Sequence, residues 1–367
     1  MLRLPRTAVI TVTAAAFGAV VTLASAQTSA PTKSAVARPN GAARTFTPKR
    51  LPWGDPDISG NFTSKEEANT PFERPDVWAG RRLEDITAAE MAKANEERRR
   101  KALADAPYPG GGSRARGVAI AVPIHWFDSL DTVNLRPWLV TDPPDGKVPP
   151  LVDGARQRQV EAAAARRGRG THDSYTDRIL SDRCIVFGIP AARTAGIYGN
   201  STQIIQTKDY VAIRYEMVHE TRIIPIAGRG ADRKRNPAAM KTAMGDAIAH
   251  WEGDTLVVDT INYDRLPNVR GAISSAKLRT IERFRRVSPD KVELTTTFDD
   301  PDSWTRPWTF AIYWTEDDSQ PIFEYACHEG NYGLRNILSA GRSDDRKGIK
   351  SSDSVDAQDE LKDVLVE

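Results

Sequence analysis

Residues 277–298, KLRTIERFRRVSPDKVELTTTF, decide the fold class of this chain. In residues 277–287, and again in 291–298, β-branched and aromatic residues alternate with charged or polar ones, which is typical of strands. Only Ser288-Pro289-Asp290 separates the two runs. Because a connection this short joins antiparallel neighbours, the stretch predicts a β-hairpin.

Further strands of the same kind are predicted on both sides of this hairpin. They are residues 203–207, 210–226, 247–251, 255–262, 308–314 and 322–327. Several of the turns between them are short, which favours an antiparallel meander over a Rossmann or TIM-barrel fold. Since such a sheet must protect its edges, we expect a mainly β fold whose meander closes into a calycin- or lipocalin-like barrel.

The chain before residue 201 is expected to form helices and loops that wrap around the barrel. Thr87 and Glu90 have the spacing of a capping box and predict a helix to about residue 104, while residues 157–167 predict a second helix and 137–140 a short strand. The expected organisation along the chain is as follows: a signal peptide at 1–26, a disordered linker at 27–50, one domain at 51–342 with its helical part at 51–200 and its meander at 201–330, and a C-terminal tail at 343–367.

The N-terminus has the features of a secretory signal peptide. Arg3 and Arg6 precede an apolar run, and residues 24–26, ASA, fit the cleavage pattern, so the mature chain is expected to begin at Gln27. The alternative is a membrane anchor, and no later stretch is apolar enough to span a membrane. We therefore expect a periplasmic or secreted protein. Its formal net charge of +2 gives no indication of a nucleic-acid partner.

The chain contains two cysteines, Cys184 and Cys327, each in or next to an apolar run. In the oxidising compartment that export implies, two cysteines most simply form one disulfide. A Cys184–Cys327 disulfide is therefore predicted, and catalytic thiol chemistry is the less favoured use of these residues.

Four segments carry a resemblance to a known family. They are WEGDTLVVDT at 251–260, ERFRRV at 282–287, DPDSWTRPWT at 300–309 and YACHEGNYGLRNIL at 325–338. Together they resemble a widespread family of exported bacterial proteins, over residues 51–342. This chain departs from the family pattern at Ala247 and His250, where the family tends to have a serine and an arginine. The resemblance implies export and brings no particular activity with it.

A candidate site lies in residues 321–336, PIFEYACHEGNYGLRN. The segment is predicted to end a strand and to continue as a loop into a short helix. It brings together Cys327, His328, Glu329 and Gly330, and titratable residues with a glycine at the end of a strand are a common way to build a site at the rim of a sheet.

Two further titratable residues are expected inside the sheet. In the predicted strand 210–226, His219 shares a face with apolar residues, and Glu282 does so in the first strand of the hairpin. His219, Glu282, His328 and Glu329 are therefore candidate catalytic acid and base groups. The alternatives are a core histidine that is hydrogen-bonded to the backbone, and a structural ion pair between Glu282 and Arg214 or Arg222.

Tyr215, Arg214, Trp308, Trp314 and Asn331 are the candidate ligand-binding residues, although aromatic residues in β proteins are more often part of the core. The chain has no dinucleotide fingerprint or serine-hydrolase elbow, and its histidines lack the spacing of a metal motif, so neither a cofactor nor a metal is expected. Two functions remain. One is an exported acid–base enzyme, namely a lyase, isomerase or hydrolase; the other is a non-catalytic binding protein for an apolar or aromatic small molecule.

Overall fold

A computed structural model describes residues 46–105, 113–115, 118–120, 132–165, 169–170, 172–196, 198–229, 234–264, 268–270, 272–319 and 322–348. The chain divides into two compact units, Met1–Ala43 and Arg44–Glu367, and all of these residues belong to the second unit. The predicted signal peptide lies outside the described residues, as do the linker before residue 46 and the tail after residue 348.

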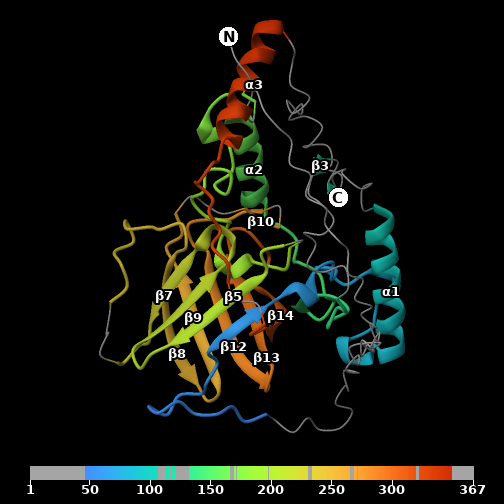
Figure 1. The fold of residues 1–367 in the computed structure, drawn as a ribbon, viewed down its shortest axis with the longest axis vertical. Coiled ribbons are helices and arrows are strands. Elements are labelled where there is room, and N and C mark those ends of the chain that lie inside the picture. The colour runs from blue at the N-terminus through green and yellow to red at the C-terminus, as the bar shows by residue number, and fades with distance from the viewer. Residues whose placement is uncertain are drawn as a thin grey trace, which may run out of the picture. The chain divides into compact units, whose positions relative to one another are not determined.

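One antiparallel sheet of ten strands dominates the structure (Figure 1). Nine strands follow each other across it in the order β7 (Thr221–Pro225), β6 (Tyr210–Tyr215), β5 (Ser201–Gln206), β1 (Gly60–Thr63), β14 (Trp308–Glu316), β13 (Lys291–Asp299), β12 (Arg279–Ser288), β9 (Thr255–Ile261) and β8 (Asp246–Glu252). The tenth, β4 (Val140–Asp142), also pairs with β14. The predicted hairpin is β12–β13, with Glu282 opposite Thr296. The mainly β, antiparallel prediction is therefore confirmed.

The sheet does not close into the barrel that was expected. Its two end strands, β7 and β8, are joined only by an isolated parallel bridge between Ile226 and Ala249, with the amide of Ala227 donating to the carbonyl of Ala249 at 2.8 Å. The reason lies in the number of strands. When every neighbour is antiparallel, the first and ninth strands of a row run in the same direction, so closure needs a parallel pair instead of another hairpin ladder.

The described residues form three α-helices, α1 (Ala88–Asp105), α2 (Asp153–Ala165) and α3 (Gly333–Lys347). The capping box of α1 is confirmed, since the amide of Thr87 donates to Oε2 of Glu90 at 2.8 Å and the amide of Glu90 donates to Oγ1 of Thr87 at 3.3 Å. Residues 322–327, predicted as a strand, form none. The predicted boundary between the domain and the C-terminal tail, after residue 342, falls inside α3. This helix is longer than expected, because it continues to its C-cap, Gly348.

The remaining elements are short. They are η1 (Lys65–Glu67), η2 (Asp76–Trp78), η3 (Leu83–Asp85), η5 (Tyr175–Asp177), η6 (Pro190–Ala192), η7 (Met217–His219) and the strand pairs β2 (Ser113–Ala115) with β3 (Val118–Ile120) and β10 (Asn268–Val269) with β11 (Ala272–Ile273).

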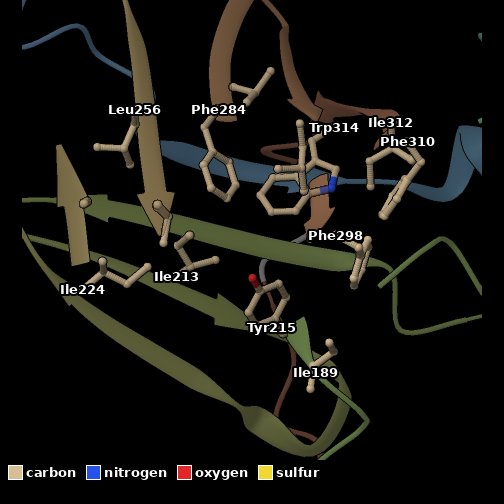
Figure 2. Packing of buried hydrophobic residues seen from close by; sticks show 14 of the residues in the cluster. Ile189, Ile213, Tyr215, Ile224, Leu256, Phe284, Phe298, Phe310, Ile312 and Trp314 are labelled. Atoms are coloured by element: carbon tan, nitrogen blue, oxygen red, sulfur yellow. The ribbon is translucent and has the colours of Figure 1, made fainter. Parts of the chain in front are cut away.

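The main core lies on the inner face of the sheet, where aromatic side chains from β6, β12, β13 and β14 meet (Figure 2). Trp308 stacks on Phe298 with 4.5 Å between ring centroids, and Phe284 packs against Trp314 at 5.6 Å. These rings come from alternate positions of their strands, which is why the period of two in the sequence identifies them as inward-facing.

Candidate functional site

A cavity of about 510 Å³ lies between the loop 187–200 and residues of β5, β6 and β14. Its volume is in the range of small-molecule sites. The lining is mostly apolar and aromatic, and it includes Phe187, Ile189, Tyr198, Tyr215, Ile312 and Trp314. Figure 2 shows Ile189 next to Tyr215, with Trp314 and Ile312 on the neighbouring part of the sheet.

The loop is held over the cavity by hydrogen bonds within the loop and by its packing against Met217, which follows β6. Asn200 accepts the amide of Gly196 at 2.8 Å and donates back to the carbonyl of Gly196 at 3.1 Å. Gly199 has φ +71°, and a Cβ there would collide with Sδ of Met217. Glycine is required at this position both by the backbone conformation and by the close approach of the methionine.

Glu220 binds the loop through a hydrogen bond and an ion pair. Its carboxylate accepts the backbone amide of Phe187 and pairs with the guanidinium of Arg193. Burial raises the pKa of Glu220, and the charge of Arg193 counteracts that increase. Because Glu220 is only 5% exposed, the two bonds are shielded from water, and they hold the residues Phe187 and Arg193 on either side of η6 in place.

Arg193 brings the charge that faces the cavity. Among the described lining residues it is the only charged one. Its guanidinium lies over the ring of Tyr215, with 4.6 Å from Cζ to the centroid, and Nε has no hydrogen-bond partner in the described part of the chain. A cation that is paired on one side and stacked on the other is fixed in position, and it still has one N–H to donate.

Behind the cavity, Tyr215 connects to a buried ion pair. Arg222 donates to Glu282 at 2.9 and 2.7 Å, to Oγ1 of Thr260 at 3.2 Å, and to the hydroxyl of Tyr215 at 3.4 Å. Glu282 is fully buried and Arg222 is 5% exposed. Burial raises the pKa of Tyr215, so its hydroxyl keeps its proton at neutral pH.

The structure does not bring the four predicted acid and base residues together. Glu282 is paired with Arg222, which is the structural alternative expected from the sequence. His219, His328 and Glu329 are exposed, and Nδ1 of His219 lies 2.9 Å from the carbonyl oxygen of Tyr325. Nothing in this arrangement pairs a histidine with an inward carboxylate.

The prediction that His219 points inward is wrong, because the strand it was assigned to is broken. β6 ends at Tyr215, the turn η7 follows, and β7 begins at Thr221; within the turn, Val218 and His219 have φ values of 58° and 46°. A left-handed turn restarts the alternation of side chains. His219 is therefore outside, and Glu220 next to it is inside.

Two of the five predicted ligand-binding residues, Tyr215 and Trp314, line the cavity. Trp308 is fully buried in the core instead, and Arg214 is half-buried on the face of β6 opposite to Tyr215. Asn331 is exposed and donates to Sγ of Cys184 at 3.4 Å. Sequence alone missed the loop residues and Glu220, since no periodic pattern marks a loop that covers a sheet.

The predicted disulfide is present. Cys184 and Cys327 are bonded, with 5.7 Å between their Cα atoms. The bond ties the segment just before the cavity loop to the segment just before α3. Residues 322–336 thus anchor the loop at one end and do not themselves line the cavity.

Within the described ranges, no three His, Cys, Asp or Glu side chains are grouped so that they could hold a metal ion. In the same part of the chain, no helix has the length and apolar character that crossing a membrane requires.

No protein-family model and no curated protein matches the chain. Among solved structures it is similar to a mutant of the fluorescent protein UnaG, at 13% identity, over 38% of this chain and 86% of that chain, with a TM-score of 0.20. A TM-score this low does not establish a shared fold, and no function of this chain follows from it.

Proposed function

We propose that this protein binds an apolar or aromatic small molecule in the cavity under loop 187–200, and that it does so without catalysing a reaction. The observation that carries the proposal is the lining: in a cavity of about 510 Å³, mostly aromatic and aliphatic side chains surround one stacked arginine. Few convergent polar groups in a mostly apolar pocket are typical of ligand sites. The ligand then lies between the loop and the inner face of the sheet.

The acid–base enzyme is the less favoured function. General acid–base chemistry needs a titratable group within hydrogen-bonding reach of the bound molecule. The residues predicted for that role are exposed or, for Glu282, bonded to Arg222 at 2.7 and 2.9 Å. Glu220, which lies next to the cavity, is engaged by the lining residue Arg193 and by the amide of Phe187.

Binding is tested with N-phenylnaphthylamine, a neutral aromatic probe whose fluorescence increases in apolar surroundings. We expect saturable binding with one site per chain. Ala192 lines the cavity, and Ala192→Trp should weaken binding by about tenfold or more, because forcing a ring into occupied space costs about 1–3 kcal/mol. The control is Ala195→Trp, in the same loop at a position that does not line the cavity. Equal binding by both variants would place the probe elsewhere and overturn the proposal.

A second pair of variants distinguishes the effect of a residue that lines the cavity from that of a residue in the core. Trp314 and Trp308 lie on the same strand and both are buried, at 4% and 0% exposure, but only Trp314 lines the cavity. Trp314→Phe should weaken probe binding several-fold by removing part of the contact surface, while Trp308→Phe should lower stability and leave the affinity unchanged. A larger loss of affinity in Trp308→Phe contradicts the assignment.

We also propose that the protein acts outside the cytoplasm, as the N-terminal sequence predicts. The Cys184–Cys327 bond supports this location, because structural disulfides persist in oxidising compartments.

A further inference from the structure

The outer face of strands β5, β6 and β7 carries a row of apolar side chains. Ile205 of β5 is paired with Ala212 of β6, and Ala212 is paired with Ile223 of β7, so the three side chains lie next to each other across the sheet. Ile205 is 49% exposed and Ile223 is 68% exposed. Because β7 is an end strand, the row extends to an edge of the sheet. A contiguous apolar row at a sheet edge is typical of an interaction surface.

The outer face of β7 lacks the charged side chains that usually keep a sheet edge from associating. The only charged residue of this strand, Arg222, points inward and is bonded to Glu282. The strand at the other end of the sheet differs. On its outer face, β8 carries the exposed His250 and Glu252, and Glu252 pairs with Arg283. Of the two end strands, β7 is therefore the one suited to pack against another protein surface.

The two sides of the apolar row differ in chemistry. Tyr210, Ala212 and Arg214 share the outer face of β6, because they occupy alternate positions of one strand. Tyr210 is 41% exposed. Arg214 is half-buried, and within the described ranges its guanidinium has no ion-pair partner. An aromatic ring and an unpaired cation thus flank the row, each two residues from Ala212.

This order of side chains is complementary to itself. When a second copy packs on the row with its β6 antiparallel, a two-fold axis at Ala212 places Arg214 of each copy over Tyr210 of the other, which is a favourable cation–π contact. The two Arg214 side chains are then about 13 Å apart, four residues along a strand. When the strands are parallel, each Arg214 faces its counterpart, and like charges repel. The charges therefore select the antiparallel arrangement.

We propose that this protein forms a symmetric dimer through the outer face of β5, β6 and β7, with the row of Ile205, Ala212 and Ile223 at its centre. The row crosses only three strands, a width of about 10 Å, so the interface is small and the dimer dissociates readily. Tyr215, which lines the cavity, lies on the opposite face of β6. Dimerisation is therefore independent of the proposed ligand binding.

Sedimentation equilibrium of the purified protein tests the dimer. We expect a reversible monomer–dimer equilibrium with a dissociation constant of about 1–100 µM, as for an interface at the small end of the size range. Ile223→Lys places a charge in the apolar contact and should weaken the dimer by about tenfold or more. The matched control is Ile179→Lys, at a position that is 66% exposed and lies outside these strands. It should leave the equilibrium unchanged.

Arg214→Gln tests the arrangement of the two copies. It removes one cation–π contact from each half of the antiparallel dimer and should weaken association by about fivefold or more. In a parallel dimer the same change removes a repulsion and strengthens association. A protein that stays monomeric at about 200 µM, well above the expected dissociation constant, overturns the proposal. So do equal effects of Ile223→Lys and Ile179→Lys, which place the contact on another surface, and a dimer that becomes tighter in Arg214→Gln.

Discussion

Glu67 is a buried carboxyl group that should make the stability of this protein depend on pH. It is 2% exposed, and it takes the place of a neighbouring strand beside β14: Oε1 accepts the amide of Tyr313 at 3.3 Å, and Oε2 accepts the hydroxyl of Thr70 at 3.1 Å. Burial raises its pKa from the ordinary value of 4.5 to about 7, against the opposing effect of Arg136. The charged form is therefore disfavoured in the folded state.

The sign of the effect follows from the two pKa values. Because the pKa is higher in the folded chain, the contribution of Glu67 to stability is complete below pH 4.5 and is lost as the pH rises through about 7. A tenfold change in proton affinity corresponds to about 1.4 kcal/mol, so the loss amounts to roughly 3 kcal/mol at pH 8. Glu67→Gln keeps the shape and cannot ionise. It should match the wild type near pH 4.5 and be more stable at pH 8 by that amount.

The assay is urea unfolding at several pH values between 4.5 and 8, followed by tryptophan fluorescence. The quantity of interest is the difference between Glu67→Gln and the wild type, since other groups titrate equally in both. Glu84→Gln, the same substitution at an exposed position, is the control and should show no difference that grows with pH. A difference between Glu67→Gln and the wild type that is constant with pH, or that favours the wild type at pH 8, would refute the reasoning.

Three further outcomes are expected. Glu282→Gln should lower the unfolding free energy by about 3–5 kcal/mol, because it leaves a buried arginine without its counter-charge. The same change at the exposed Glu252 should have little effect in the same urea titration, and similar losses at both positions would be inconsistent with the buried pair. Replacing Cys184 and Cys327 together by serine should lower stability by about 3–5 kcal/mol, since the bond closes a loop of 143 residues, and a melting temperature that is unaffected would argue against this. Intact-mass measurement of the exported protein should give a chain that begins at Gln27, and a chain that retains the preceding residues would contradict the signal peptide.

The sequence by itself determined the features that depend on local order. The period of two in residues 277–298 and the short turn within it were sufficient to predict β12, β13 and their antiparallel pairing, because side-chain alternation and turn length are properties of neighbouring residues. The same holds for the capping box of Thr87 and Glu90 at α1. The Cys184–Cys327 bond was predictable for a different reason: only two cysteines were available to pair.

Tertiary structure alone decided how these parts form a site. The left-handed turn at Val218 and His219 reverses which residues face inward, and a pattern that assumes one continuous strand cannot reveal it. The cavity exists because Glu220 holds a loop through Arg193, 27 positions earlier in the chain. Closure of the sheet likewise depends on how many strands lie between its two ends, which is a property of the whole sheet and not of any strand. Such long-range contacts leave no periodic trace in the sequence, and they place Tyr215 and Trp314 in a cavity and Trp308 in the core.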